Sequence, residues 1–124
     1  RRAFRADALT VNTSILTAIS NDYSFDRVYA RQLEAVGRPG DVAVGLSTSG
    51  KAASVILAFE KARELGMTTV AMTGSAASPA SALADHWIAV PSTDTPRIQE
   101  SHITIGHLWA ELIEAALVAD GAGG

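Results

Sequence analysis

The stretch from Asp41 to Gly50, DVAVGLSTSG, decides the fold, because an apolar run passes directly into a cluster of hydroxyl side chains. Residues 41–46 are apolar on both alternating faces, which is typical of a strand covered on both sides in a parallel sheet. A helix is predicted from Ala53 to Leu65, where apolar side chains recur on one side and Gly66 follows as a stop signal. The stretch therefore predicts a strand, a polar loop and a helix in succession.

The rest of the chain repeats this alternation of short apolar strands and longer amphipathic helices. Further strands are predicted over residues 8–11, 67–72 and 87–90. Further helices are predicted over residues 13–20, 25–36, 81–85 and 97–119. Strands and helices that alternate at this spacing predict a parallel sheet inside a three-layer α/β/α sandwich. Since the sequence contains no repeat and no linker, residues 1–124 are expected to form a single domain.

The composition excludes several classes of protein. The 124 residues include 10 Lys and Arg against 13 Asp and Glu, and the net charge of −3 provides no basic surface for nucleic acid or an anionic membrane. The absence of cysteine excludes disulfides, a zinc finger and a thiol nucleophile. No apolar run reaches the ~20 residues of a membrane span, and no signal segment is expected, because the chain opens with Arg1-Arg2 and is polar again at Arg5. A cytoplasmic protein is expected.

Three consecutive hydroxyl side chains, Ser47, Thr48 and Ser49, follow the predicted strand 41–46. Ligands of open α/β sheets bind beyond the carboxyl ends of the strands, and the N–H groups at a helix N-terminus suit a phosphate. A simple helix cap would need one hydroxyl, whereas this loop has three. The loop therefore favours a cradle for a phosphate or a sugar phosphate, and Lys51 beside it is read as a solvated side chain.

Two other polar clusters are candidates for a site. The segment 97–102, RIQESH, opens the last predicted helix, and His107 follows among apolar neighbours. Histidine suits proton transfer near neutral pH, although a histidine among apolar neighbours is also compatible with a structural core position. Asn21 and Asp22 stand in a predicted loop between two helices, where they are ordinary turn residues unless a ligand binds them.

Four motifs together resemble one known family. They are STSG at residues 47–50, Asn21-Asp22-Tyr23 with an aromatic residue at Phe25, RPGD at 38–41 and RIQESH at 97–102. This combination resembles sugar isomerase (SIS) domains, which have a flavodoxin-like or Rossmann-like fold, and within them the phosphoheptose isomerases. The resemblance extends over about residues 8–117. It implies a cytoplasmic homotetramer that converts sedoheptulose 7-phosphate to D-glycero-D-manno-heptose 7-phosphate for surface polysaccharide such as lipopolysaccharide.

The resemblance also implies a role for each matching residue. Asn21 and Asp22 correspond to the pair that contacts the sugar, and residues 47–49, which are Ser47, Thr48 and Ser49, to the phosphate loop. Gln99 corresponds to a residue that binds both the substrate and a zinc ion. His107 corresponds to a zinc ligand that is also the acid/base catalyst.

The chain departs from the family pattern at two places. Gly50-Lys51-Ala52 replaces the usual Gly-Asn-Ser, so the hydroxyl at position 52 is absent. The family's N-terminal part, with a Gly-rich loop and a helix that supplies two further zinc ligands, has no counterpart in these 124 residues. We therefore expect neither tightly held zinc nor isomerase activity from residues 1–124 alone.

The spacing of the two implied zinc ligands presents a geometric difficulty. Eight residues of straight helix rise ~12 Å, whereas each zinc ligand must come within ~2.0–2.2 Å of the ion. We therefore predict that Gln99 lies in an irregular turn before the helix, that the helix bends before His107, or that the two ligands belong to different subunits.

Two other functions remain open at the level of sequence. One is a non-catalytic SIS scaffold that resembles the replication-initiator-associating protein, which carries Asn at the position of His107. The other is a regulatory domain that senses a sugar phosphate, which would use the hydroxyl loop but leave Gln99 and His107 unexplained. The presence of His107 favours the isomerase over the scaffold. The closing helix, 97–119, is apolar around much of its circumference, which favours an oligomer in all three cases.

Overall fold

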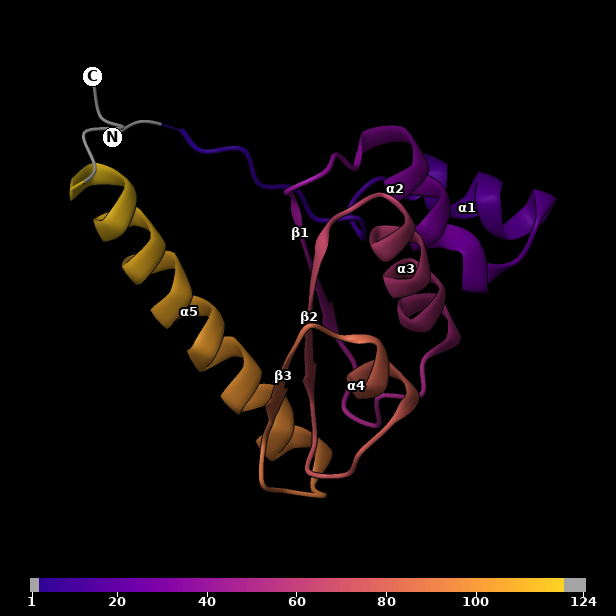
Figure 1. Cartoon of the computed structure of the whole chain (residues 1–124). Coiled ribbons are helices and arrows are strands. Elements are labelled where there is room, and N and C mark those ends of the chain that lie inside the picture. The colour runs from indigo at the N-terminus through magenta and orange to yellow at the C-terminus, as the bar shows by residue number, and fades with distance from the viewer. Residues whose placement is uncertain (1–2, 120–124) are drawn as a thin grey trace.

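A computed structural model describes residues 3–119 of the chain as an α/β fold (Figure 1). Within these residues the strands are β1 (Val42–Leu46), β2 (Thr68–Thr73) and β3 (His86–Ala89). The α-helices are α1 (Thr13–Asp22), α2 (Val28–Val36), α3 (Ala53–Glu64), α4 (Pro79–Leu83) and α5 (Thr95–Ala119), and a 3₁₀ turn, η1 (Phe25–Arg27), precedes α2. The predicted class, a parallel sheet with helices between its strands, is confirmed.

The sheet is parallel and its strands lie in chain order, β1-β2-β3. Val44 of β1 is opposite Val70 of β2, and Met72 of β2 is opposite Ile88 of β3. In a parallel sheet all carboxyl ends meet at one edge. The hydroxyl loop after β1, the Thr73-Gly74 end of β2 and the segment after β3 therefore lie together at that edge.

The core lies between the sheet and the helices on one of its faces. One cluster of buried side chains joins α2 to α3, and it consists of Leu33, Ala58, Ala62 and Met67. A second cluster joins α3, β2 and α4, and it consists of Val55, Phe59, Ala71 and Ala80. The Phe59 ring packs directly against the backbone of Gly45 in β1, where a Cβ would lie 2.6 Å from Phe59 Cζ.

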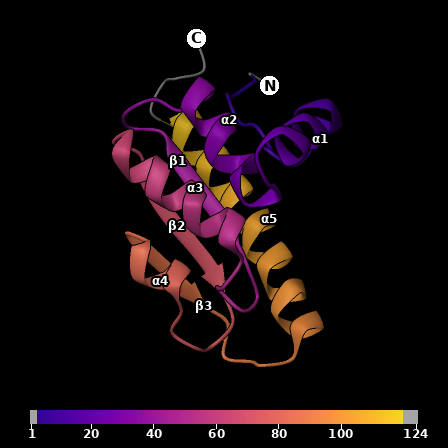
Figure 2. The same cartoon turned by 90° about the vertical axis from the view of Figure 1, so that its right-hand side faces the viewer.

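The other face of the sheet is covered only near the carboxyl edge. There α5 begins against the sheet and then leads away from it (Figures 1 and 2). Ile98 and His102, in the first two turns of α5, are 3% and 4% exposed. Beyond them the β1 side chains on this face are open, and Val42, Val44 and Leu46 are 59%, 45% and 53% exposed. The prediction that β1 is covered on both faces is therefore wrong within this chain, because α5 diverges.

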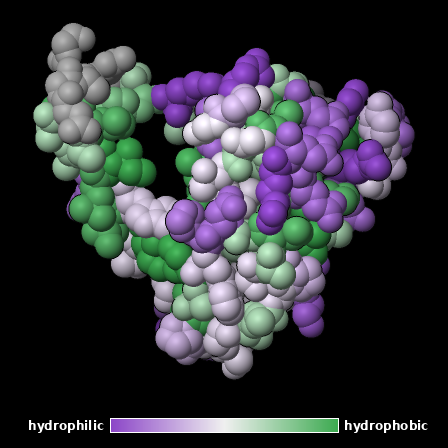
Figure 3. Space-filling model, viewed as in Figure 1, coloured by the Kyte–Doolittle hydropathy of each residue, from purple (hydrophilic) through white to green (hydrophobic). Residues whose placement is uncertain are grey.

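Apolar side chains also gather along α5 itself (Figure 3). The large apolar residues of α5 that are more than half exposed are Ile103, Leu108, Leu112, Ile113 and Val118. They do not pack on the sheet of their own chain, because the helix has already left it. No described helix is both long and apolar enough to cross a membrane.

Several predicted boundaries differ from the structure. The strand predicted at residues 8–11 is wrong: this segment makes a turn that leads into α1, whose N-cap is Asn12 with its side chain accepting from Ile15 N at 3.1 Å. The helix predicted over residues 25–36 begins as the 3₁₀ turn η1. The short helix predicted at 81–85 lies at Pro79–Leu83, because Ser78 caps it and Pro79 suits its first turn.

Candidate functional site

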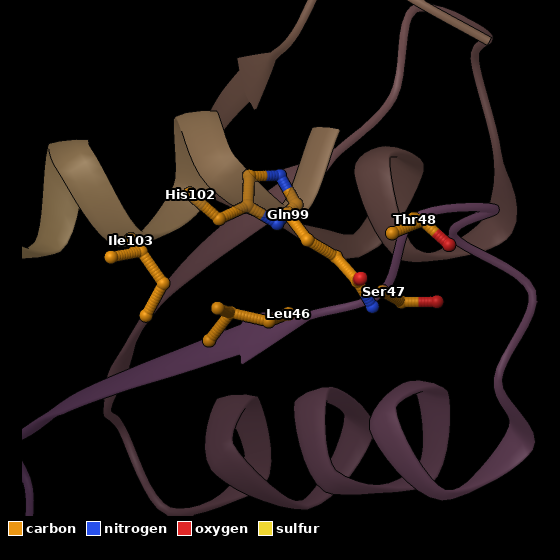
Figure 4. A pocket seen from close by; sticks show the side chains of 6 residues that line it. All are labelled: Leu46, Ser47, Thr48, Gln99, His102 and Ile103. Atoms are coloured by element: carbon orange, nitrogen blue, oxygen red, sulfur yellow. The ribbon is translucent and has the colours of Figure 1, made fainter. Parts of the chain in front are cut away.

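A pocket of about 480 Å³ opens between the carboxyl end of β1 and the first turns of α5 (Figure 4). Its lining residues come from these two elements and are Leu46, Ser47, Thr48, Gln99, His102 and Ile103. The hydroxyl loop thus faces the start of α5. The two polar motifs, STSG at residues 47–50 and RIQESH at residues 97–102, therefore contribute to one pocket. This is also the edge at which open α/β sheets bind their ligands.

The hydroxyl loop is held against β2 and α4 by its backbone. Ser47 N donates to Met72 O at 3.0 Å, and Gly74 N donates to Thr48 O at 2.9 Å. Gly50 turns the chain with a φ of +66°, and Ala80 N at the start of α4 donates to Gly50 O at 3.1 Å. These bonds fix the loop in one conformation without using its side chains.

The hydroxyl groups and the start of α3 form a polar surface beside the pocket. Ser47 Oγ accepts from Gly50 N at 3.1 Å, and Ser49 Oγ accepts from Lys51 N at 3.2 Å. Ala52 occupies the N-cap position of α3, and no side chain of the described residues caps this helix. Free N–H groups at the start of a helix attract an anion. The loop and α3 therefore provide hydroxyl and amide donors in the arrangement that a phosphate requires.

The start of α5 is fixed across the pocket by two buried side chains. Ile98 packs on Gly74, where a Cβ would lie 2.8 Å from Ile98 Cδ1 and 2.9 Å from Thr48 O. One helical turn later, His102 Nε2 lies 3.2 Å from Thr73 O. Gln99 lies between these anchors, and its side chain extends toward Ser47 (Figure 4). The anchors thus hold the Gln99 amide opposite the hydroxyl loop.

Thr73, at the end of β2, connects the anchors to the rest of the sheet. Its hydroxyl donates to Gly74 O at 2.9 Å and accepts from Trp87 Nε1 at 2.8 Å. Its carbonyl oxygen lies near His102 and also accepts from Val90 N at 3.0 Å. The sequence patterns did not point to Thr73, and they included His102 only as a member of the candidate segment 97–102, without a role of its own. The available signal was the position of His102, one turn after Gln99 on the same helix face.

Four of the residues assigned to the site by resemblance do not line this pocket. Asn21 and Asp22 are exposed at the end of α1, which packs near α2 on the opposite side of the sheet from α5 (Figure 1), and Asn21 Nδ2 donates to Asp22 Oδ1 at 3.0 Å. Ser49 is exposed next to the lining residues Ser47 and Thr48. The structure therefore brings together Ser47, Thr48 and Gln99, and leaves Asn21, Asp22, Ser49 and His107 outside the pocket.

The sequence profile of the SIS domain matches residues 2–74, which contain β1, the hydroxyl loop and β2. The chain belongs to the SIS domain family. The pocket of this SIS domain thus lies at the end of the matched strands, with its second wall supplied by α5 from the segment that follows the match.

Curated relatives and solved structures point to one branch of the family. The chain is 55% identical over 114 residues to the phosphoheptose isomerase of Akkermansia muciniphila and 53% identical over 110 residues to that of Rhodospirillum rubrum. These alignments cover 92% and 89% of the chain, but only 60% and 58% of the relatives' length.

Two solved structures of phosphoheptose isomerases are similar to the chain over most of its length. Phosphoheptose isomerase GmhA from Neisseria gonorrhoeae superposes with a TM-score of 0.85 at 47% identity, over 87% of this chain. A phosphoheptose isomerase from Francisella tularensis superposes with a TM-score of 0.88 at 32% identity, over 91% of this chain. The chain spans 61% of each of those two proteins.

Within one copy of the SIS domain, Gln99 and His107 do not fit a common zinc site. Both residues lie in the continuous helix α5, so the prediction of an irregular turn at Gln99 is wrong. Eight residues of α-helix separate them by ~12 Å along the axis. Gln99 lines the pocket, whereas His107 is exposed further along the helix. No group of three His, Cys, Asp or Glu side chains in residues 3–119 is arranged to hold a metal ion.

The pKa shifts that the structure explains lie away from the pocket. Backbone and side-chain hydrogen bonds from Thr69 lower the pKa of Asp85, which precedes β3 at the opposite edge of the sheet. On the α2 surface, the hydrogen bond from Arg31 lowers the pKa of Glu34. The residues that line the pocket include no carboxylate. The pocket therefore presents neutral donors and acceptors rather than an acidic pair.

Proposed function

We propose that this SIS domain binds a phosphorylated sugar in the pocket between the hydroxyl loop and α5, and that the protein is a phosphoheptose isomerase. Its substrate is then sedoheptulose 7-phosphate and its product D-glycero-D-manno-heptose 7-phosphate. The observation that supports this most directly is the hydroxyl loop at the carboxyl end of β1, which is held by backbone hydrogen bonds and whose Ser47 and Thr48 line the pocket together with Gln99. The names of relatives that are about half identical to the chain, phosphoheptose isomerases, support a heptose phosphate as the class of substrate.

In this proposal the phosphate group binds at the hydroxyl loop. The hydroxyls of Ser47, Thr48 and Ser49 and the uncapped start of α3 donate hydrogen bonds to its oxygens. Lys51 is exposed beside them and adds positive charge at the entrance. Because the backbone holds the loop in place, the phosphate meets a site that is already formed, and little ordering entropy is lost on binding.

The sugar chain then extends along the start of α5. The Gln99 amide can both donate to and accept from sugar hydroxyls, and Leu46 and Ile103 provide apolar walls. Isomerisation moves a proton between C1 and C2 and also between the two oxygens, so it needs an acid/base group. His107 is proposed for this role, but from another copy of the chain, because it lies outside the pocket of its own copy.

A homotetramer completes the proposed site. The exposed apolar residues of α5 supply the surface on which copies would associate. Asn21 and Asp22, which contact the sugar by resemblance, are likewise proposed to join the pocket of a neighbouring copy. Zinc belongs to the proposal only as an ion shared between chains, with Gln99 and His107 from different copies, since one copy does not bring them together.

A second candidate function, a sensor of sugar phosphates, is favoured by one observation. The described pocket contains the binding groups but not His107, and its lining includes no carboxylate. A sensor would bind sedoheptulose 7-phosphate without converting it, whereas the isomerase forms the aldose. Because residues 1–124 alone are not expected to isomerise the sugar, the two functions are separated in a chain that also carries the family's N-terminal part, by NMR detection of the aldose after incubation with the ketose.

The binding site is tested by calorimetric titration with sedoheptulose 7-phosphate. Replacement of Ser47 and Ser49 together by Ala is expected to raise Kd at least tenfold, which corresponds to about 1.4 kcal/mol. Ser14→Ala, an exposed change on α1, is the matched control and should leave Kd unchanged. An unchanged Kd in the double variant would show that the phosphate binds elsewhere.

A further inference from the structure

His102 is the most deeply buried polar side chain that lines the pocket. Phosphate binding at the hydroxyl loop gives no reason for a histidine at this position. His102 is 4% exposed, yet it lines the pocket together with Gln99 and Thr48. We propose that His102 is a sugar-binding residue, whose imidazole Nδ1 accepts a hydrogen bond from a hydroxyl group of the bound sugar phosphate. This inference rests on the proposed function, because it requires a polyhydroxylated ligand in this pocket.

The neighbouring carbonyl determines which ring nitrogen carries the proton. Nε2 lies 3.2 Å from Thr73 O, and a carbonyl oxygen can only accept. Nε2 must therefore be the N–H donor, which leaves Nδ1 of the neutral ring as an acceptor. Thr73 O also accepts from Val90 N at 3.0 Å, so the carbonyl that orients the ring is itself fixed by the sheet edge.

The second ring nitrogen is open to the pocket. Among residues 3–119, no enclosed side-chain nitrogen or oxygen lacks a hydrogen-bond partner, and the only hydrogen bond of the His102 side chain there is the one from Nε2. Nδ1 is therefore not enclosed, and the space beside the ring is the pocket that His102 lines. Figure 4 shows a ring nitrogen on the side of the ring that faces Gln99 and Leu46.

An acceptor at this position complements the rest of the pocket. Ser47 and Thr48 supply hydroxyl groups, and Gln99 supplies an amide with two N–H donors. Sugar hydroxyls must also donate their own hydrogens, and a fixed Nδ1 lone pair accepts one of them. A buried polar group that a ligand fails to satisfy costs binding energy, so such a site rejects an analogue without that hydroxyl. His102 is therefore expected to recognise the sugar rather than the phosphate.

Two substitutions separate the role in binding from the role in structure. His102→Gln places its amide nitrogen where Nε2 stood, which keeps the bond to Thr73 O and removes the pocket acceptor. His102→Asn places its amide oxygen near the position of Nδ1, which keeps an acceptor but loses the bond to Thr73 O. We expect His102→Gln to weaken binding of sedoheptulose 7-phosphate about five- to tenfold, with inorganic phosphate binding and the thermal midpoint unchanged. His102→Asn should lower the thermal midpoint and weaken sugar binding less.

The direct readout is the ¹⁵N NMR spectrum of the imidazole in the wild-type chain at pH 8. Nδ1 should resonate in the range of a nitrogen without a proton, and sedoheptulose 7-phosphate should shift that signal as a hydrogen bond forms. Inorganic phosphate should shift the amides of residues 47–53 but leave Nδ1 unchanged.

Each other outcome overturns the inference and identifies what failed. If the sugar phosphate shifts the loop amides while Nδ1 stays unchanged, the proposed function stands and His102 does not contact the sugar. If the sugar phosphate shifts neither, the proposed function fails, and the role of His102 fails with it. If the proton is found on Nδ1 in the free chain, the tautomer argument is wrong.

Discussion

Gly50→Ala is expected to destabilise the chain through two separate effects at the hydroxyl loop. Gly50 has a φ of +66°, a backbone conformation that costs a residue with a Cβ about 1–2 kcal/mol. The new Cβ would also lie 2.0 Å from Ser78 Oγ and 2.5 Å from Ser78 Cβ. Such overpacking costs a further ~1–3 kcal/mol. The expected loss in the free energy of unfolding is therefore about 2–5 kcal/mol.

Gly40→Ala is the matched control for the backbone effect. Gly40 has a φ of +87°, but a Cβ there would meet no atom within 4 Å, so only the backbone cost applies. In urea denaturation, Gly50→Ala should lose about 1–3 kcal/mol more than Gly40→Ala. Adding Ser78→Gly to Gly50→Ala should recover most of that difference, because both clashing atoms are removed. Equal losses in the two single variants would refute the packing described for this loop.

Three further predictions concern the helices and the acid stability. Asn12→Ala should cost about 1 kcal/mol in urea denaturation, because the Asn12 side chain caps α1, and Asn12→Ser should retain most of the stability. Hydrogen bonds from Thr69 lower the pKa of Asp85 in the folded state, so its contribution is complete above the unfolded chain's pKa and is lost as the pH falls through the folded value. Asp85→Asn should accordingly lower the thermal midpoint at pH 7, with the difference from wild type vanishing in acid; a difference that persists there would exclude this carboxylate as the cause. Light scattering should show an oligomer, because α5 exposes several large apolar side chains, and a stable, well-folded monomer would contradict the proposed assembly.

Much of the fold could be predicted from local patterns. The apolar run at 42–46 became β1, and α3 ends before Gly66, whose φ of +73° a residue with a Cβ rarely adopts. The hydroxyl loop lies at the carboxyl end of β1 as predicted, because the edge position follows from the parallel sheet alone. These features depend on residues close together in the chain.

The features that could not be predicted depend on distant parts of the chain. Residues 8–11 have strand-like side chains, but the described sheet pairs no strand with them, so they form a turn. The direction of α5 decides that Ile98 and His102 are buried and that Val44 is open, and helical periodicity carries no information about that direction. The distance between Gln99 and His107 could be calculated in advance, but which of the two lines the pocket follows from the direction of α5, and only Gln99 does.

The phosphate site is tested most directly by calorimetric titrations that compare sedoheptulose 7-phosphate with unphosphorylated sedoheptulose on the wild-type chain. In the proposed site the phosphate lies at the loop 47–49 and at the uncapped start of α3. We expect measurable binding of the phosphorylated sugar and at least tenfold weaker binding of sedoheptulose, a difference of about 1.4 kcal/mol or more. Equal affinity for the two sugars, or no binding of the phosphorylated one, would show that this phosphate site is wrong.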